Sequence, residues 1–407
     1  MRYWWHKGEV VLEYIKLSEL AQIYNGNSIN KTVKQQKYTG LTEGRNFIAT
    51  KDVGFDGTVT YENGVKIPFD EPKFKTAPAD CVFVCSEGGS AGKKTAYITQ
   101  EVCFGNKLYA IVKNSDLYYA KYIYFFTRSE LFFKQFKGLL NGIIGGVSSK
   151  NFGTIQIPIT DLPTQQRIVT RIEELFSQLD SGVETLKKTK AQLAVYRQAV
   201  LKEAFECIDK TDTIRNMTSI VTSGSRGWAK YYSDKGAKFI RIGNLTRTGI
   251  SIDLSDVQYV SLPEKAEGLR SRLQANDILV SITADLGSIG IVPSEIGEAY
   301  INQHIAMVRF KNANQAKFMA YYLRSDIGQK YLLKNKRGAG KLGLGLDDIR
   351  DSRVPLVSDE QAKDIVSEIE SRLSVCDSIE KTVDEALQQA EGLRQSILKK
   401  AFEGELL

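Results

Sequence analysis

Histidine and cysteine are scarce in this chain, and their scarcity excludes whole classes of site. The 407 residues include two histidines and five cysteines. An odd number of scattered cysteines predicts buried thiols in a reducing cytoplasm rather than a disulfide framework. The histidines stand apart from the cysteines, so a zinc site has little support. The residues concerned are Cys81, Cys85, Cys103, Cys207, Cys376, His6 and His304.

Membrane and secretion signals are missing as well. The sequence has no run of ~18 apolar residues, so no membrane-spanning helix is predicted. The first residues, MRYWWHKGEVVLEYIKL, contain neither a long apolar segment nor a cleavage-like site of small residues. We therefore expect no signal peptide and a cytoplasmic protein.

Catalytic motifs are also lacking. There is no N-P-P-[YF] motif to hold a target amine, so the chain should not methylate adenine itself. GGSAGKK at 88–94 differs from a phosphate-binding loop in its glycine spacing and has no Ser or Thr after Lys93. Asp277, Asp285 and His304 could be imagined as nuclease ligands, but no D…E-x-K pattern accompanies them. A free-standing enzyme is therefore disfavoured.

The overall composition is that of a folded protein, with 42% hydrophobic and 25% charged residues. Lysine and arginine outnumber the acidic residues 55 to 48, which gives a formal charge of +7. This mild excess of positive charge is compatible with a nucleic-acid ligand, although many basic proteins bind none.

A long internal repeat is the most informative feature of the sequence. Residues 168–206 return 197 positions later, without a gap, as residues 365–403, and 16 of the 39 aligned positions are identical. Each copy follows a non-helical segment of similar size. The chain therefore consists of two half-proteins in tandem, each a globular module that ends in a long helix. A pseudo-dimer of this kind suggests a ligand with two parts.

The repeat extends into the globular modules. DILVSI at 277–282 matches DCVFVC at 80–85, and both segments have the character of strands. AKFMAYYLRS at 316–325 matches AKYIYFFTRS at 120–129, within a helical stretch predicted over 120–139. A Gly-rich loop follows in each copy, at 141–151 and 337–346, and a short strand at 154–159 or 354–356 closes the module. The loops have diverged, as two different recognition specificities would require.

The two repeated helices have the pattern of a coiled coil. Apolar residues recur every 3.5 residues on average over about five heptads. A helix of ~40 residues is ~60 Å long, and two such helices joined through a module most simply pack antiparallel. Ser358 with Gln361 predicts a capping box, Thr164 is a plausible N-cap, and Gly404 fits the position just after a helix end. The alternative is a pair of ordinary core-facing helices in one compact domain.

These patterns predict an α+β fold with an internal pseudo-two-fold repeat. Two mixed α/β domains, at 1–160 and 210–357, are separated by two long antiparallel coiled-coil helices, at 161–209 and 358–407.

The helical motifs carry a family resemblance. LPTQQRIVTRIEELFSQLD and YRQAVLKEAFE in the first helix, with LRQSILKKAFEGEL in the second, resemble the specificity subunit of type I restriction–modification systems. The resemblance covers essentially the whole chain. The second copy departs from the pattern at its start, where SDEQAK at 358–363 replaces LP-x-QQ, but the rest of that copy stays in register.

The resemblance implies a function and partners. Two target-recognition domains would each read one half of a bipartite, asymmetric site in double-stranded DNA. The helices would set the spacing between the halves and dock two methyltransferase subunits, and motor–nuclease subunits would join that complex. The chain itself would hold no cofactor, since S-adenosylmethionine, ATP and Mg are expected on the partner subunits.

Candidate DNA contacts are basic and polar residues in Gly-rich loops, because phosphates favour Lys and Arg while base edges favour Arg, Asn, Gln, Ser and Thr. Lys150 and Lys341 are the strongest pair, since each lies late in a Gly loop before the closing strand. Any single member could instead be a solvated loop residue. In the first module the candidates are Arg45, Lys51, Lys93, Lys94, Asn106, Lys107, Ser148, Ser149 and Lys150. In the second module they are Arg226, Arg241, Asn244, Arg247, Thr283, Gln303, His304, Lys336, Arg337 and Lys341.

The shared R-Q-x-x-L-K-x-A-F-E pattern at both helix ends suggests a duplicated contact with duplicated partners. Plain solvation of the charged residues is the alternative. The predicted partner-binding residues are Arg197, Gln198, Phe205, Arg394, Gln395 and Phe402.

Two rival functions remain open at this point. The same fold could serve a related fused or two-gene restriction system, which only the neighbouring genes would distinguish. A coiled-coil scaffold whose modules bind protein or sugar is the other rival, and it predicts no salt-dependent affinity for DNA.

Overall fold

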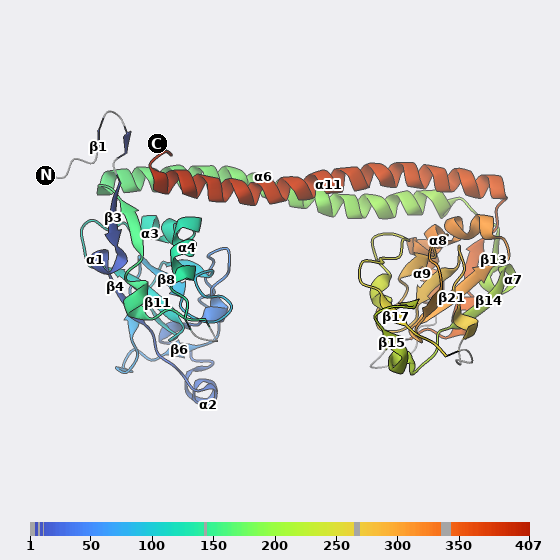
Figure 1. The fold of residues 1–407 in the computed structure, drawn as a ribbon, viewed down its shortest axis with the longest axis horizontal. Coiled ribbons are helices and arrows are strands. Elements are labelled where there is room, and N and C mark those ends of the chain that lie inside the picture. Colours follow the sequence, from blue (N-terminus) through green and yellow to red (C-terminus); the bar gives the residue numbers. More distant parts are fainter. Residues whose placement is uncertain (1–4, 7–8, 11, 142–144, 264–268, 335–342) are drawn as a thin grey trace. The chain divides into compact units, whose positions relative to one another are not determined.

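The computed structural model describes residues 5–6, 9–10, 12–141, 145–263, 269–334 and 343–407. The chain forms two compact units, one of Met1–Leu186 with Glu385–Leu407 and one of Lys187–Asp384. Two helices of 45 residues each, α6 (Leu162–Glu206) and α11 (Asp359–Glu403), contribute one segment to each unit (Figure 1). Among the described helices, none is both long enough and apolar enough to cross a bilayer.

The globular part of the first unit contains two four-stranded sheets and a short closing pair of strands. One sheet has the order β4-β11-β8-β9 and is antiparallel throughout. The other has the order β6-β5-β10-β7 and contains one parallel pair, β5 with β10. The strands are β1 (Trp5–His6), which pairs with β2 (Glu9–Val10), and β3 (Glu13–Lys16), β4 (Ala21–Asn25), β5 (Arg45–Ile48), β6 (Lys66–Ile67), β7 (Thr76–Ala77), β8 (Cys81–Cys85), β9 (Thr95–Ile98), β10 (Val102–Phe104), β11 (Leu108–Lys113) and β12 (Gln156–Ile159).

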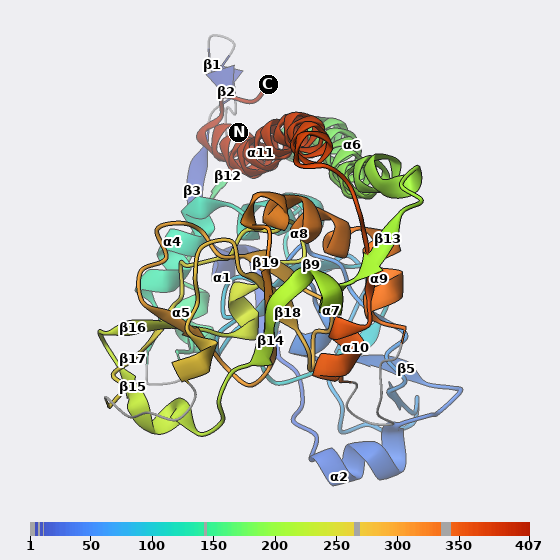
Figure 2. The same ribbon diagram turned by 90° about the vertical axis from the view of Figure 1, so that its right-hand side faces the viewer.

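The second unit repeats this plan. Its sheets have the orders β14-β21-β18-β19 and β15-β17-β16-β20, and the parallel pair is β16 with β20. In Figure 2, α8 (Ala316–Arg324) lies between the long helices and the strands β18 and β19 of this unit. The strands are β13 (Thr211–Thr213), β14 (Thr218–Ser223), β15 (Tyr232–Ser233), β16 (Ala237–Ile240), β17 (Gln258–Val260), β18 (Ile278–Ser281), β19 (Ile289–Ile291), β20 (Ala299–Ile301), β21 (Ile305–Phe310) and β22 (Arg353–Pro355).

Each unit uses the end of one long helix to complete its core. In the first unit, Phe402 of α11 packs against Tyr122 and Phe126 of α3 (Ala120–Thr127), with ring centroids 5.1 and 5.5 Å away. In the second unit, Phe205 of α6 packs in the same way against Phe318 and Tyr322 of α8, both at 5.4 Å. Burial of an aromatic ring contributes strongly to stability, so these contacts fix each globular part to the helix pair.

The two long helices run antiparallel within the second unit. Lys190 of α6 pairs with Asp384 of α11 at 2.7 Å, Arg197 pairs with Asp377 at 2.7 Å, and Glu203 pairs with Arg372 at 2.9 Å. Residue numbers therefore rise along α6 as they fall along α11. The mixed α/β fold with an internal repeat and a long helix pair, expected from the sequence, is confirmed.

Local boundaries follow from capping. The predicted box at the start of α11 is present, because Ser358 Oγ accepts from the Gln361 amide and Gln361 Oε1 accepts from the Ser358 amide, both at 3.2 Å. Gly404 follows α11 with a φ of +84°, as predicted. At α6 the cap is Asp161 rather than Thr164, since the Thr164 amide donates to Asp161 Oδ1 at 3.0 Å.

The helical stretch predicted over 120–139 is two helices. Ser129 breaks it, because its hydroxyl accepts from the Phe132 amide and starts α4 (Glu130–Gly138). Ser325 does the same in the second unit, where it starts α9 (Asp326–Leu332). A serine therefore caps the second helix in the same way in both units.

Candidate nucleic-acid interface

Three loops meet at one place in each unit, and the same backbone hydrogen bonds join them. In the first unit, the Ser86 amide donates to the Lys107 carbonyl at 2.9 Å and the Val147 amide donates to the Ser86 carbonyl at 3.1 Å. In the second unit, Ile282 donates to His304 at 2.9 Å and Leu344 donates to Ile282 at 3.0 Å. We call residues 86–94, 105–107 and 145–150 the first loop cluster, and residues 282–288, 302–304 and 343–344 the second loop cluster.

Glycines hold the neighbouring backbone close enough to form these clusters. A Cβ on Gly26 would lie 1.9 Å from the Phe104 carbonyl oxygen, and a Cβ on Gly224 would lie 1.9 Å from the Ile301 carbonyl oxygen. Only glycine permits so close an approach. The turn of residues 105–107 follows Phe104 and joins β10 to β11, and the turn of residues 302–304 follows Ile301 and joins β20 to β21.

The first loop cluster presents several exposed lysines. Lys93 and Lys150 are exposed, and Lys107 is exposed while paired with Glu87 at 3.0 Å. Lys94 is half-buried, donates to the Thr50 carbonyl at 3.1 Å, and lies 5.0 Å from the centre of the exposed Phe55 ring. Lys51, in the short helix Thr50–Asp52, is exposed beside this group. Charges held this way by a folded loop suit phosphate contacts.

The polar candidates of the first cluster have two different roles. Ser148 caps α5 (Ser149–Phe152), because its Oγ accepts from the Asn151 amide at 3.2 Å. Ser149 Oγ is 3.4 Å from the Ile23 carbonyl, and both serines remain exposed. Asn106 is exposed in the turn between β10 and β11, so its amide is available to a base edge.

Arg45 lies outside the first loop cluster and is already engaged. Its Nε contacts the Glu101 carboxylate, and its guanidinium lies 5.1 Å from the centre of the Phe69 ring. A DNA contact from Arg45 would have to share or break this ion pair.

The second loop cluster holds a fixed histidine, His304, at the place of Lys107. His304 Nδ1 lies 2.7 Å from Thr283 Oγ1, and its Nε2 lies 2.9 Å from the Gln303 amide nitrogen. An amide nitrogen can only donate, so Nε2 accepts and Nδ1 carries the proton that faces Thr283. The three side chains form one hydrogen-bonded row in the second loop cluster.

Arg247 borders the second cluster through an ion pair with Asp285. Two guanidinium nitrogens contact Asp285 Oδ1, one of them at 2.7 Å, and the pair holds the pKa of that carboxyl below its usual range, with a further contribution from the Ser288 hydroxyl. Arg247 nevertheless keeps more than half of its side chain exposed, at 60%. It can therefore contact a phosphate without being released from Asp285.

Asn244 has a positioning role that corrects the expectation of a direct contact. It is buried, its Oδ1 accepts from the Arg241 amide at 2.8 Å, and its Nδ2 donates to the carbonyls of Asp253 and Asp256 at 2.8 and 3.0 Å. Asp52 closes the equivalent turn of the first unit by accepting from the Ala49 amide at 2.9 Å. Arg241 pairs with Asp256 at 3.7 Å and borders, with His304, a hollow of about 350 Å³.

The remaining candidates of the second unit divide into two groups. Arg226 is exposed. Lys336, Arg337 and Lys341 lie outside the described residues, so the pairing of Lys150 with Lys341 stays a prediction.

The residues predicted to bind a partner at the helix ends mostly serve the chain itself. Phe205 and Phe402 are buried at 3% and 1% exposure under the rings described above, which corrects the expectation that they contact another subunit. Arg197 bridges Asp377 and Glu380 at 2.7 and 2.8 Å, and Arg394 pairs with Asp180 over the Phe176 ring. Gln198 and Gln395 each have a buried Oε1 for which no hydrogen-bond partner is found.

A duplicated ion pair was missed in the sequence. Lys121 of α3 pairs with Glu173 of α6 at 2.7 Å, and Lys317 of α8 pairs with Glu370 of α11 at 2.7 Å. All four residues lie inside the aligned repeats, so a search for charges retained in both copies would have found them.

The cysteines and acidic residues form no obvious metal centre. Among the described residues, no group of three His, Cys, Asp or Glu side chains could hold a metal ion. Burial raises the pKa of the Cys81 thiol to about 12, with a smaller contribution from Asp80, so this residue stays a thiol at neutral pH.

Comparisons with known proteins agree with the architecture. The model of the family described as "Type I restriction modification DNA specificity domain" matches residues 10–194 and 229–389. The specificity subunit of the type I restriction enzyme EcoBI from Escherichia coli is 25% identical over 435 aligned residues, which cover 96% of this chain and 85% of that subunit.

Solved structures share the fold at lower identity. A chain from a structure titled for complex assembly and conformational transition of the type I R-M system has a TM-score of 0.77 at 16% identity, covering 97% of this chain and 98% of that one. The HsdS subunit from Thermoanaerobacter tengcongensis has a TM-score of 0.55 at 16% identity, with 97% of both chains covered. With a family match over most of its length, the chain belongs to the type I restriction–modification DNA specificity family.

Proposed function

We propose that this chain reads a bipartite, asymmetric DNA site, with one half-site at the first loop cluster and the other at the second. As a member of the specificity family it is a non-catalytic subunit. Methylation and cleavage would be carried out by two methyltransferase subunits and by motor–nuclease subunits. These partners would bring S-adenosylmethionine, ATP and Mg.

The observation that carries the proposal is a repeated frame with unlike side chains on it. The same backbone hydrogen bonds build both loop clusters, yet Lys107 stands in one cluster where His304, beside Gln303, stands in the other. Two loop clusters with the same backbone and different side chains suit two unlike half-sites.

The long helices offer a surface for partner subunits. Since the Phe205 and Phe402 rings are buried, the docking surface must use other residues. Large apolar side chains on α6 and α11 are exposed in the second unit, with Val195 at 71% and Val375 at 59%. Exposed apolar side chains on a coiled coil favour contact with another protein.

Methylation mapping tests the recognition role. Genomic DNA would be sequenced for modified bases in hosts carrying the neighbouring methyltransferase gene with and without this chain. We expect a bipartite motif with a fixed gap that is present only with this chain. A soluble complex that yields no motif would contradict DNA reading. Absence of any complex would favour the scaffold function.

Two further measurements separate the parts of the proposal. Affinity for the mapped duplex should fall steeply with salt, because bound lysines and arginines release counterions. Inserting about four residues within residues 185–192, which is about 6 Å of helix, should change the tolerated gap while leaving both half-sites unchanged. An altered half-site sequence would show that the helices do not set the spacing.

A further inference from the structure

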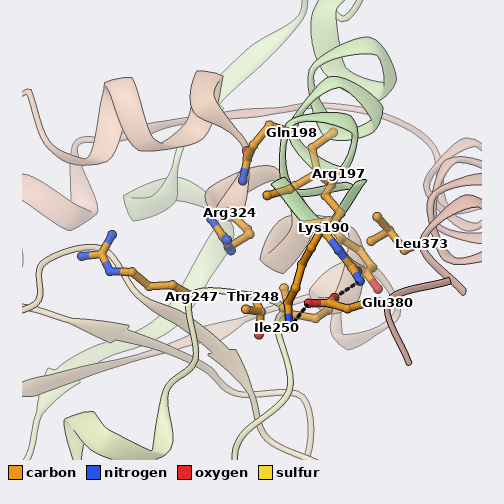
Figure 3. A pocket seen from close by; sticks show the side chains of 13 residues that line it. Lys190, Arg197, Gln198, Arg247, Thr248, Ile250, Arg324, Leu373 and Glu380 are labelled. Carbon is orange, nitrogen blue, oxygen red and sulfur yellow. Dashed lines mark hydrogen bonds and ion pairs between the residues drawn. The ribbon is translucent and has the colours of Figure 1, made fainter. Parts of the chain in front are cut away.

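A charged pocket in the second unit contains an arginine that forms no ion pair with any residue that the structure describes. The pocket has a volume of about 130 Å³ and is lined by α6, α8, α11 and the loop after residue 246 (Figure 3). Lys190 is paired with Asp384, Arg197 with Asp377 and Glu380, and Arg247 with Asp285. For Arg324 no ion pair is found among the described residues, and its buried Nε has no hydrogen-bond partner.

A second unmatched group lines the same pocket. Gln198 descends from α6 toward Arg324 in Figure 3, and its buried Oε1 also has no partner. Buried polar groups are normally hydrogen-bonded, and leaving one unpaired is costly. Burial lowers the pKa of Arg324, the nearby positive charge of Arg247 lowers it further, and Asp326 offsets this only in part. The surrounding groups therefore do not fully neutralise the guanidinium.

The first unit shows how an aromatic ring satisfies the same position. Arg128 is the repeat counterpart of Arg324, and its guanidinium lies 5.5 Å from the centre of the Tyr124 ring. The counterpart of Tyr124 in the second unit is Ala320, which offers no ring. Lys190 and Glu380 likewise correspond to Leu387 and Val183. In the second unit, a small alanine therefore stands where the first unit has an aromatic partner, and charged residues stand at two helix positions that are apolar in the other copy.

We propose that this pocket binds a phosphate-sized oxyanion on Arg324, with Gln198 and the Thr248–Gly249 segment of the pocket wall beside it. A guanidinium with free donors is well matched to phosphate oxygens. The pocket volume of about 130 Å³ is several times the ~30 Å³ of liquid volume that one water molecule takes, so the pocket has room for a small anion. The phosphate could be inorganic or could belong to a DNA backbone.

Thermal unfolding of the full chain in sodium phosphate and in sodium chloride at equal ionic strength tests the site. Phosphate should raise the unfolding midpoint of the wild type and of Arg128→Gln by about 2 °C or more beyond chloride. Part of that rise comes from exclusion of phosphate from the protein surface and is common to all variants. Arg324→Gln should lose the remaining, specific part, and Arg324→Lys should retain some of it. An equal phosphate response in Arg324→Gln and Arg128→Gln would overturn the proposal.

A carboxylate built into the pocket gives an independent test that does not remove the arginine. Gln198→Glu should pair with Arg324, raise the unfolding midpoint in chloride and abolish the specific response to phosphate. Gln395→Glu is the matched control, because Gln395 Nε2 donates to the Arg128 carbonyl at 3.4 Å and a carboxylate there would repel it. That variant should lower the midpoint. If Gln198→Glu also lowers the midpoint and leaves the phosphate response intact, the site is refuted.

The source of the phosphate is decided by DNA binding. If a backbone phosphate fills the pocket, Arg324→Gln should reduce the slope of log affinity against log salt by about 0.9 relative to Arg128→Gln. An unchanged slope with a lost phosphate response assigns the site to free phosphate. The thermal measurements need no DNA, so they remain decisive even if the proposed function fails.

Discussion

In the first unit Lys121 pairs with Glu173 and Phe402 packs on Tyr122, while in the second Lys317 pairs with Glu370 and Phe205 packs on Phe318. The two loop clusters keep their backbone hydrogen bonds but not their side chains. An exposed Lys107 paired with Glu87 occupies the place of His304, which is held by Thr283 and Gln303. Residues that join each globular part to the helices are therefore constrained by shape, whereas residues at the loop tips are free to differ.

The largest test of the shared frame is removal of its aromatic anchors. Phe402→Ala and Phe205→Ala should each lower the free energy of unfolding by about 3–5 kcal/mol, because a buried ring leaves a cavity. Hydrogen exchange should show lost protection in α3 for the first variant and in α8 for the second. The exposed Leu393→Ala serves as the control and should change stability by less than about 0.5 kcal/mol. If both variants lost protection in the same helix, the two rings would not anchor separate units.

The next largest effect is expected from substitutions in the turns that Asn244 and Asp52 close. Asn244→Ala removes three hydrogen bonds from a buried turn and should cost about 1–3 kcal/mol. Asp52→Ala removes the matching contact in the first unit and should cost less, since a single bond to the Ala49 amide is lost there. Denaturant unfolding measures both variants, and equal costs would show that the two turns are not built differently.

Substitutions at the loop tips should separate effects on DNA affinity from effects on base preference. His304→Ala should relax base preference in one half-site by about 1–3 kcal/mol, since it removes a fixed row of donors and acceptors. Lys107→Ala should weaken binding to all sequences alike and reduce the salt slope by about 0.9. Competition among randomised duplexes measures both effects. The assignment of roles fails if Lys107→Ala alters base preference and His304→Ala does not.

The smallest effect concerns the backbone of the same loops. Gly88 has a φ of +80° in the first cluster, and Ala284 has a φ of +58° in the second. Gly88→Ala should destabilise the chain and Ala284→Gly should stabilise it, each by up to about 1 kcal/mol, because left-handed backbone penalises a Cβ. Thermal unfolding of both variants checks the opposite signs, and a shared sign would mean that the loops differ in conformation.

The repeat made the frame predictable from sequence. Aligned copies located β8 and β18, the helices that follow, and the long pair with its capping box at Ser358 and Gln361. Local patterns were weaker where a side chain could cap in more than one way. Asp161 took the role expected for Thr164, and Ser129 divided a helix that looked continuous because its apolar pattern does not pause.

The candidate site was predictable as a region and not residue by residue. Composition marks a loop as basic or polar, but it does not show whether a side chain is already used. Asn244 makes its hydrogen bonds within its own turn, Arg45 pairs with Glu101, and Arg197 pairs with two acidic residues of α11. Whether Arg324 is paired depends on which residue its side chain faces, and only the three-dimensional structure shows this.

The first unit is assembled from two distant stretches of chain, Met1–Leu186 and Glu385–Leu407, whereas the second is one continuous stretch. During synthesis the second unit can therefore complete its core as soon as its own residues have emerged. The first unit must wait for Leu398, Ala401 and Phe402, which lie in its core and are translated after the whole of the second. The half of the protein that is made first is thus the half that finishes folding last.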